Sequence, residues 1–157
     1  MTFVEYLIYF CAVVLPWVMG GGLIVYLIFT KKKISALRLV GLSFFSALLA
    51  WFLASLVKYN FPSPRPFEVY AHLKPLFTTA QGDAFPSGHA TFIGALAVGV
   101  FLQRKKLGLI FILGAVLVAA ARVLAHVHWP ADVIAGLLFG ALIAIIVGAV
   151  YSKVYPR

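Results

Sequence analysis

Three basic side chains stand close to the ends of apolar segments, where a charge needs a partner. Lys58 ends one apolar run, Arg65 follows it seven residues later, and Arg122 lies near the end of another run. Cations near a hydrocarbon layer are unfavourable unless they are paired or hydrated. A phosphate would satisfy them, and the planar guanidinium group can form two parallel hydrogen bonds with its oxygens. We therefore expect Lys58, Arg65 and Arg122 to bind a phosphate.

A helix is expected to begin at Pro86-Ser87-Gly88-His89, where a long apolar run starts. Proline suits the first turn of a helix or its edge. The first N–H groups of a helix have no partner within the helix and carry the positive end of its dipole. Gly88 has no side chain to hinder an anion that approaches this backbone. The tetrapeptide therefore predicts an anion-binding helix start, although Ser87 and Gly88 alone are also typical of an ordinary one.

His128 and Asp132 stand four residues apart, and Pro130 favours a helix that begins between them. Asp132, in the first turn of that helix, could turn back toward His128. A carboxylate bonded to one imidazole nitrogen fixes the tautomer and leaves the other nitrogen free to attack. His89, beside the expected anion site, could donate a proton to a leaving oxygen. These residues predict phosphoryl transfer, which mainly requires positioning and positive charge around the phosphate.

The segments that carry these residues have the composition of a membrane protein. Hydrophobic residues make up 64% of the 157 residues and charged residues 11%, against about 45–50% and about 25% in a soluble domain. We expect one domain over residues 1–157, an all-α integral membrane helical bundle with about five transmembrane helices. The first could bend at Pro16 or Gly20-Gly21-Gly22. The five apolar runs, each long enough or nearly so to cross about 30 Å of hydrocarbon, are Phe3–Phe29, Ile34–Val57, Pro86–Leu102, Leu107–Leu124 and Pro130–Tyr151.

The long segment Lys58–Phe85 separates the second and third runs. It holds four prolines, so we expect it to be a non-helical loop. Five spans place all four acidic residues on the side of this loop, whereas most basic residues fall on the other side. Because cytoplasmic loops carry an excess of Lys and Arg, that other side is expected to be cytoplasmic. We therefore expect a multi-pass protein of the cell membrane whose long loop and active site face the extracytoplasmic side. The basic residues on the cytoplasmic side are Lys31, Lys32, Lys33, Arg38, Arg104, Lys105, Lys106, Lys153 and Arg157.

Taken together and in this order, the three motifs resemble the signature of the type 2 phosphatidic acid phosphatase family, which is related to the vanadium haloperoxidases. The motifs are Lys-x6-Arg-Pro, Pro-Ser-Gly-His and Arg-x5-His-x3-Asp, and they span Lys58 to Asp132, about half the chain. Jointly they are highly specific, whereas any one alone would be weak. The resemblance implies a helical bundle and a covalent phosphohistidine mechanism. It further implies that His128 is the nucleophile, that Asp132 is its partner and that His89 is the acid for the leaving group; the phosphate would be held by Lys58, Arg65, Ser87, Gly88 and Arg122.

Two features depart from the family pattern. The family usually has Ser before the Arg of the third motif, where this chain has Ala121. One possible hydrogen bond is thereby lost, which we expect to alter the rate rather than the type of reaction. Many membrane members have six spans, whereas five are counted here.

Other functions remain open alongside this interpretation. We expect no metal and no cofactor, although His89, His126, His128 and Asp132 are ligand types that suit zinc; the nearby cations would repel a divalent ion. The basic residues stand in short runs between apolar segments, so we expect no nucleic-acid partner. A non-catalytic transporter of anionic lipids is a distant alternative, for which the Asp-oriented histidine would be surplus.

The expected substrate is a membrane lipid phosphate, hydrolysed by a metal-independent phosphoric ester or acid anhydride hydrolase. Undecaprenyl pyrophosphate is the first choice, because the short chain and its Arg-Pro-Phe run resemble the bacitracin-resistance branch of the family. That branch often has Asp where this chain has Gly88. Phosphatidylglycerophosphate, phosphatidate and lipid A phosphates are alternatives, and the sequence does not indicate an oligomeric state.

Overall fold

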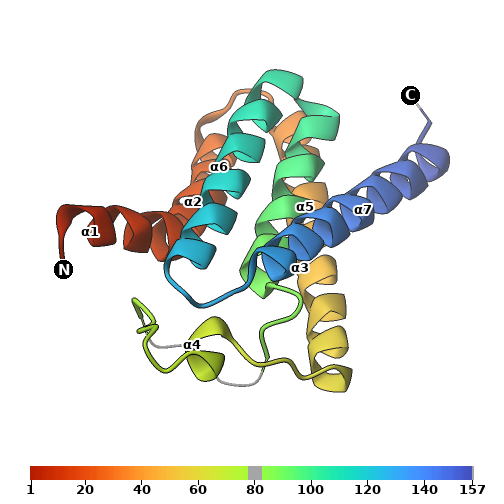
Figure 1. Cartoon of the computed structure of the whole chain (residues 1–157). Coiled ribbons are helices and arrows are strands. Elements are labelled where there is room, and N and C mark those ends of the chain that lie inside the picture. Colours follow the sequence, from red (N-terminus) through yellow and green to blue (C-terminus); the bar gives the residue numbers. More distant parts are fainter. Residues whose placement is uncertain (78–82, 157) are drawn as a thin grey trace.

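All five apolar runs form helices, as predicted (Figure 1). The computed structural model describes residues 1–77 and 83–156. Its elements in chain order are α1 (Phe3–Tyr9), the π-helical segment η1 (Phe10–Val14), α2 (Leu15–Phe29), α3 (Lys33–Asn60), α4 (Pro66–Val69), α5 (Gly88–Gln103), α6 (Lys105–Leu124) and α7 (Pro130–Val154). The predicted all-α bundle of a multi-pass membrane protein is confirmed.

Four helical stretches are long and apolar enough to cross a membrane: Phe3–Phe29, Lys33–Asn60, Lys105–Leu124 and Pro130–Val154. The fifth apolar run forms α5, which is shorter, with 16 residues. At 1.5 Å per residue it extends about 24 Å, somewhat less than a hydrocarbon layer. Because α5 packs against α3, α6 and α7, it is the central helix of the bundle, and most of its residues are buried by its neighbours.

The first helical stretch changes direction between α1 and α2 (Figure 1). The turn between α1 and α2 occurs at η1, which ends two residues before Pro16, whereas Gly20-Gly21-Gly22 lies inside α2. Proline cannot donate the hydrogen bond that continues an α-helix and its ring crowds the preceding turn, which a wider π-helical turn accommodates. The expected bend is therefore at the proline and not at the glycines.

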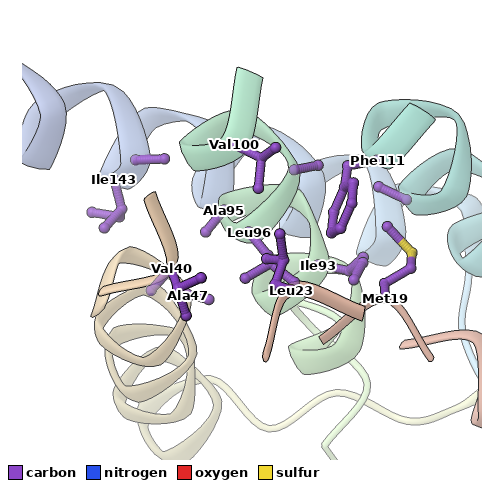
Figure 2. Close-up of a cluster of buried hydrophobic side chains, with 14 of the residues drawn as sticks. Met19, Leu23, Val40, Ala47, Ile93, Ala95, Leu96, Val100, Phe111 and Ile143 are labelled. Carbon is purple, nitrogen blue, oxygen red and sulfur yellow. The ribbon is translucent and has the colours of Figure 1, made fainter. Parts of the chain in front are cut away.

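Helices α5 and α7 approach each other closely through glycines. A Cβ atom at Gly136 would lie 2.7 Å from the carbonyl oxygen of Ser87, and one at Gly140 would overlap the carbonyl oxygen of Thr91. Small residues at such positions let the backbones of membrane helices touch, where van der Waals packing drives association. Larger apolar side chains from α2, α3, α5, α6 and α7 fill the rest of the core, including Leu23, Ile93 and Leu96 (Figure 2). The start of α5 is thus held firmly against the start of α7.

The long loop contains one helical turn that the prolines led us not to expect. Pro66 occupies the first turn of α4, and Glu68 Oε2 accepts a hydrogen bond from the backbone N–H of Arg65 at 2.6 Å. Proline is well suited to the first position of a helix, where its missing N–H is not needed. The prediction of a wholly non-helical loop was therefore wrong over Pro66–Val69.

Candidate active site

The three predicted motifs meet at one end of the bundle. The end of α3, the long loop with α4, the start of α5 and the link between α6 and α7 all lie there (Figure 1). This arrangement follows from the alternating direction of successive spans, which returns the chain to the same end after every second crossing. Residues 58–66, 86–89 and 122–132 are brought together although they are far apart in the sequence.

Arg65 lies against His128, although 63 positions separate them. The Arg65 side chain is buried, and its Nη1 donates to the carbonyl oxygen of Val127 at 2.8 Å. The same Nη1 lies 3.5 Å from His128 Nε2. The loop residue Pro64 also accepts a hydrogen bond from the indole Nε1 of Trp129 at 3.0 Å. The first and third motifs are therefore packed directly against each other.

Asp132 does lie next to His128, but it makes its shorter contact elsewhere. Asp132 Oδ2 accepts a hydrogen bond from the backbone N–H of Trp129 at 2.8 Å and lies 3.5 Å from His128 Nδ1. A distance of 3.5 Å is longer than a normal hydrogen bond. The backbone carbonyl of Asp132 accepts from the N–H of Ser87 at 3.0 Å. Asp132 thus closes the first turn of α7, ties it to the start of α5 and faces the Nδ1 side of the imidazole.

His128 is nearly fully buried, and this sets its protonation state. Its side chain is 2% exposed. Burial lowers the pKa of His128 to about 4, opposed by the Asp132 carboxylate, and the charges of Arg122, Arg65 and Lys58 lower it further. Of these three cations, Arg65 is the one in direct reach of the imidazole, and Arg122 and Lys58 act on it through their charge. At neutral pH His128 is uncharged, which is the form that has a nitrogen lone pair available for attack.

The start of α5 presents backbone donors and a buried hydroxyl. Ser87 is the residue before the first turn and is fully buried, but its Oγ has no hydrogen-bond partner among the described residues. Gly88 lies beside Lys58 and Trp51, because a Cβ atom there would come 3.9 Å from Lys58 Cε and 3.4 Å from the indole. The side chain of His89 is exposed. The first amides of α5, Lys58 and His89 therefore flank one region at the start of this helix.

The two remaining cations differ in their surroundings. Lys58 Nζ donates to the carbonyl oxygen of Asp83 at 2.5 Å. Arg122 is buried, with its Nη1 3.5 Å from the carbonyl oxygen of Ala12 and its guanidinium 5.3 Å from the ring centroid of Phe77. Its direct contacts therefore go to η1 and the long loop, and its link to the other motif residues is through its charge.

Buried polar atoms without partners gather at this site. In the described part of the chain they are Arg65 Nε, Ser87 Oγ, Arg122 Nε, His128 Nδ1 and, away from the site, Ser43 Oγ. Buried polar atoms in folded proteins are almost always hydrogen-bonded. Four of these five atoms belong to residues that the sequence assigns to phosphate binding or catalysis. Their unused hydrogen-bonding capacity is suited to a polar ligand.

Sequence reasoning missed Asp83, whose carboxylate Oδ1 accepts from Arg65 Nη2 at 2.9 Å. The only signal was an acidic residue four positions before Ser87 on the same side as the basic motif residues, which does not specify a contact.

The residues considered as zinc ligands are not gathered into a metal site: within residues 1–77 and 83–156, no group of three or more His, Cys, Asp or Glu side chains is placed to hold a metal. His126 instead turns its Nδ1 toward the carbonyl oxygen of Lys74, at 3.3 Å.

Known proteins share both the sequence pattern and the fold. A lipid A 1-phosphatase of Rhizobium johnstonii is 32% identical over 114 residues, which cover 70% of this chain and 47% of the relative. An undecaprenyl-diphosphatase of Sulfolobus acidocaldarius is 36% identical over 119 residues, which cover 75% of this chain and 56% of the relative. The chain thus spans about half the length of these relatives.

The crystal structure of LpxE from Aquifex aeolicus superposes with a TM-score of 0.77 at 26% identity, covering 95% of this chain and 87% of that chain. The family model described as the PAP2 superfamily matches residues 39–156, a range that includes all three motifs. The resemblance expected from the motifs is confirmed: the chain belongs to the PAP2 superfamily.

Proposed function

We propose that this protein is a membrane lipid phosphatase that works through a phosphohistidine at His128. The observation that carries the proposal is the buried, uncharged His128 placed between a carboxylate at its Nδ1 and a guanidinium at its Nε2. A carboxylate on one side of an imidazole favours the tautomer with a proton on that side. Nε2 is then the nitrogen that attacks phosphorus, on the side where Arg65 would hold the phosphate.

The reaction proceeds in two steps. Nε2 of His128 forms a bond to phosphorus while the bond from phosphorus to the leaving oxygen breaks, and His89 gives that oxygen a proton. The exposed position of His89 at the start of α5 allows it to reach a leaving group outside the buried site. Neutral His89 then accepts a proton from water, which attacks phosphorus, releases inorganic phosphate and restores His128.

The phosphate is held by Lys58, Arg65, Ser87, Gly88 and Arg122 in this proposal. The unpartnered Nε atoms of both arginines, the buried hydroxyl of Ser87 and the first amides of α5 supply donors on several sides. Fixed donors and positive charges stabilise the charge on the non-bridging oxygens in the transition state. These groups provide the positive charge that the reaction needs, so no metal or cofactor takes part in any proposed step.

A lipid phosphate fits the position of the site better than a soluble ester does. Lys58, Arg122 and Asp132 lie near the ends of helices that are long and apolar enough to cross a membrane, so an apolar tail can stay in the bilayer while its phosphate enters the site. Undecaprenyl pyrophosphate is our first choice, supported by the name of the Sulfolobus relative. Lipid A phosphate is the main alternative, supported by the name of the Rhizobium relative. Phosphatidylglycerophosphate and phosphatidate complete the set.

We further propose that the site faces the extracytoplasmic side. The support is the distribution of charge, since the two short basic connections after α2 and α5 lie at the end of the bundle opposite the site. Single cysteines at Ser63 and Lys105, in a Cys11→Ser background, can be labelled with an impermeant thiol reagent in intact cells. Labelling at position 63 alone supports the proposal, and labelling at position 105 alone overturns it.

The experiment that tests the function is phosphate release by the purified protein from the four lipid classes and from a soluble phosphate ester. The expected result is release from at least one lipid class that exceeds release from the soluble ester and persists in excess EDTA. Preference for the soluble ester would contradict the lipid assignment. Loss of activity with EDTA, restored by zinc or magnesium, would contradict the metal-independent mechanism. Binding of lipid without any phosphate release would favour the non-catalytic transporter.

A further inference from the structure

Asp83 accepts hydrogen bonds from two of the cations that are predicted to bind phosphate, Arg65 and Lys58. Its carboxylate Oδ1 accepts a hydrogen bond from Arg65 Nη2 at 2.9 Å, and its backbone carbonyl accepts from Lys58 Nζ at 2.5 Å. The carbonyl oxygen also lies 3.4 Å from Arg65 Nη2. Neither the three motifs nor the roles proposed above include this residue.

The contact limits how Arg65 can bind a phosphate. Its Nη1 donates to the carbonyl oxygen of Val127, and its Nη2 donates to Asp83, so within residues 1–77 and 83–156 only its Nε is without a partner. A guanidinium binds a phosphate most strongly through two parallel N–H groups. To use Nη2 in such a pair, the phosphate must take the place of the Asp83 carboxylate.

The Asp83 side chain can leave while its backbone stays. The next two residues are held by Ser63: the N–H of Ala84 donates to the carbonyl oxygen of Ser63 at 3.1 Å, and the N–H of Phe85 donates to its Oγ at 2.9 Å. The side chain of Asp83 itself is 40% exposed. Rotation of this side chain into water therefore removes the 2.9 Å contact of the carboxylate with Arg65 Nη2 and leaves only the 3.4 Å contact of Nη2 with the backbone carbonyl. The hydrogen bond from Lys58 to that carbonyl is kept.

We propose that Asp83 is an internal counter-anion that competes with phosphate for Arg65 and thereby determines anion affinity at the site. It neutralises a buried guanidinium when no substrate is bound, since a buried cation without a partner is unfavourable. A lipid substrate has its apolar tail to add to binding and displaces the carboxylate. Inorganic phosphate has no such tail, so the return of Asp83 promotes release of this product. The inference rests on the proposed phosphatase function.

The test measures, by calorimetry in detergent, how tightly tungstate, a phosphate-like oxyanion, binds to each purified protein. The proteins compared are the wild type and the Asp83→Asn and Asp83→Ser variants. Both variants remove the competing charge, and we expect each to bind tungstate about two- to fivefold more tightly, with a matching fall in the inhibition constant for inorganic phosphate. These factors correspond to an ion pair that is partly screened by solvent. Asp83→Glu, which keeps the charge, and Glu5→Gln, which removes a charge at the start of α1, serve as controls and should bind tungstate as the wild type does.

The inference would be overturned if Asp83→Asn and Asp83→Ser melt like the wild type but bind tungstate no more tightly than it does. Weaker binding would show instead that Asp83 positions Arg65. An equal gain in Glu5→Gln would also overturn it, because the effect would then be one of net charge. The titration needs no turnover. A protein that binds tungstate more tightly in both variants but releases phosphate from no lipid would therefore contradict the proposed function and leave the role of Asp83 standing.

Discussion

The carboxylate of Asp132 lies 3.5 Å from His128 Nδ1 while it accepts a 2.8 Å hydrogen bond from the backbone N–H of Trp129. One oxygen therefore serves both the first turn of α7 and the orientation of the imidazole. The position of the proposed nucleophile is consequently fixed by the start of a helix, a more rigid support than the link between α6 and α7 in which His128 lies would provide.

This double role predicts different results for two substitutions of Asp132. Asp132→Asn keeps an oxygen that can accept from the Trp129 amide, so stability should change little, while kcat falls because the charge that stabilises a positive imidazole is lost. Asp132→Ala should lower kcat similarly and also cost about 1 kcal/mol of stability through the lost helix cap. We expect the fall in kcat to be about 10²–10⁴-fold. Steady-state kinetics and thermal melting in detergent measure the two effects, and Asp132→Asn with wild-type kcat would exclude a role in catalysis.

The pH dependence of kcat/KM reports the protonation of His128. Burial lowers the pKa of folded His128 from 6.5 to about 4, so the nucleophile stays uncharged from neutral pH down to about pH 5. The acid limb of the profile should therefore begin only below this range, with activity falling tenfold per pH unit under the pKa. The unfolded chain binds a proton near pH 6.5 that the folded site does not, so this group also makes the free energy of unfolding fall as the pH drops from 6.5 toward 4.

Arg65 provides a control for the pH experiment. Its charge is one of the causes that lower the pKa of His128, so Arg65→Gln should move the acid limb of kcat/KM to higher pH, in addition to weakening phosphate binding. An acid limb near pH 6.5 in the wild type, unmoved in Arg65→Gln, would show that the limb belongs to another group.

Close packing between α5 and α7 is predicted to control both stability and activity. A Cβ atom at Gly140 would overlap the carbonyl oxygen of Thr91, whereas one at Gly21 in α2 would meet nothing within 4 Å. Gly140→Ala should therefore destabilise the protein by about 1–3 kcal/mol through overpacking and lower activity by shifting the start of α5 away from Asp132. Gly21→Ala is the matched control and should leave melting temperature and activity unchanged. Equal melting temperatures for the two variants would contradict the packing described here.

The sequence predicted the convergence of the site because that result depends only on the number and direction of the spans. Long apolar runs identify spans by composition, and alternating directions place Lys58, His89 and His128 at one end whatever the details of packing. The pairing of His128 with Asp132 could be predicted for a different reason. The two residues stand four positions apart at the start of a helix, so their proximity depends only on local geometry.

Other features depend on how loops pack, which no periodic pattern encodes. The contacts of Asp83 with Arg65 and of Arg122 with Phe77 join segments that the sequence treats only as loop and helix end. The α4 turn was missed because prolines were taken as helix breakers, although Pro66 stands where a helix tolerates proline best. The bend at η1 could be predicted from Pro16 but not its π-helical form.

The most direct test of the mechanism is to trap phosphate on His128. The protein is mixed with a lipid substrate that carries ³²P in its terminal phosphate and quenched in alkali, in which a phosphohistidine survives. We predict that label appears on the peptide that contains His126 and His128, is retained in His126→Ala and is absent from His128→Ala, which should also release no phosphate while it melts as the wild type does. Wild-type labelling or wild-type phosphate release by a folded His128→Ala protein would contradict the account.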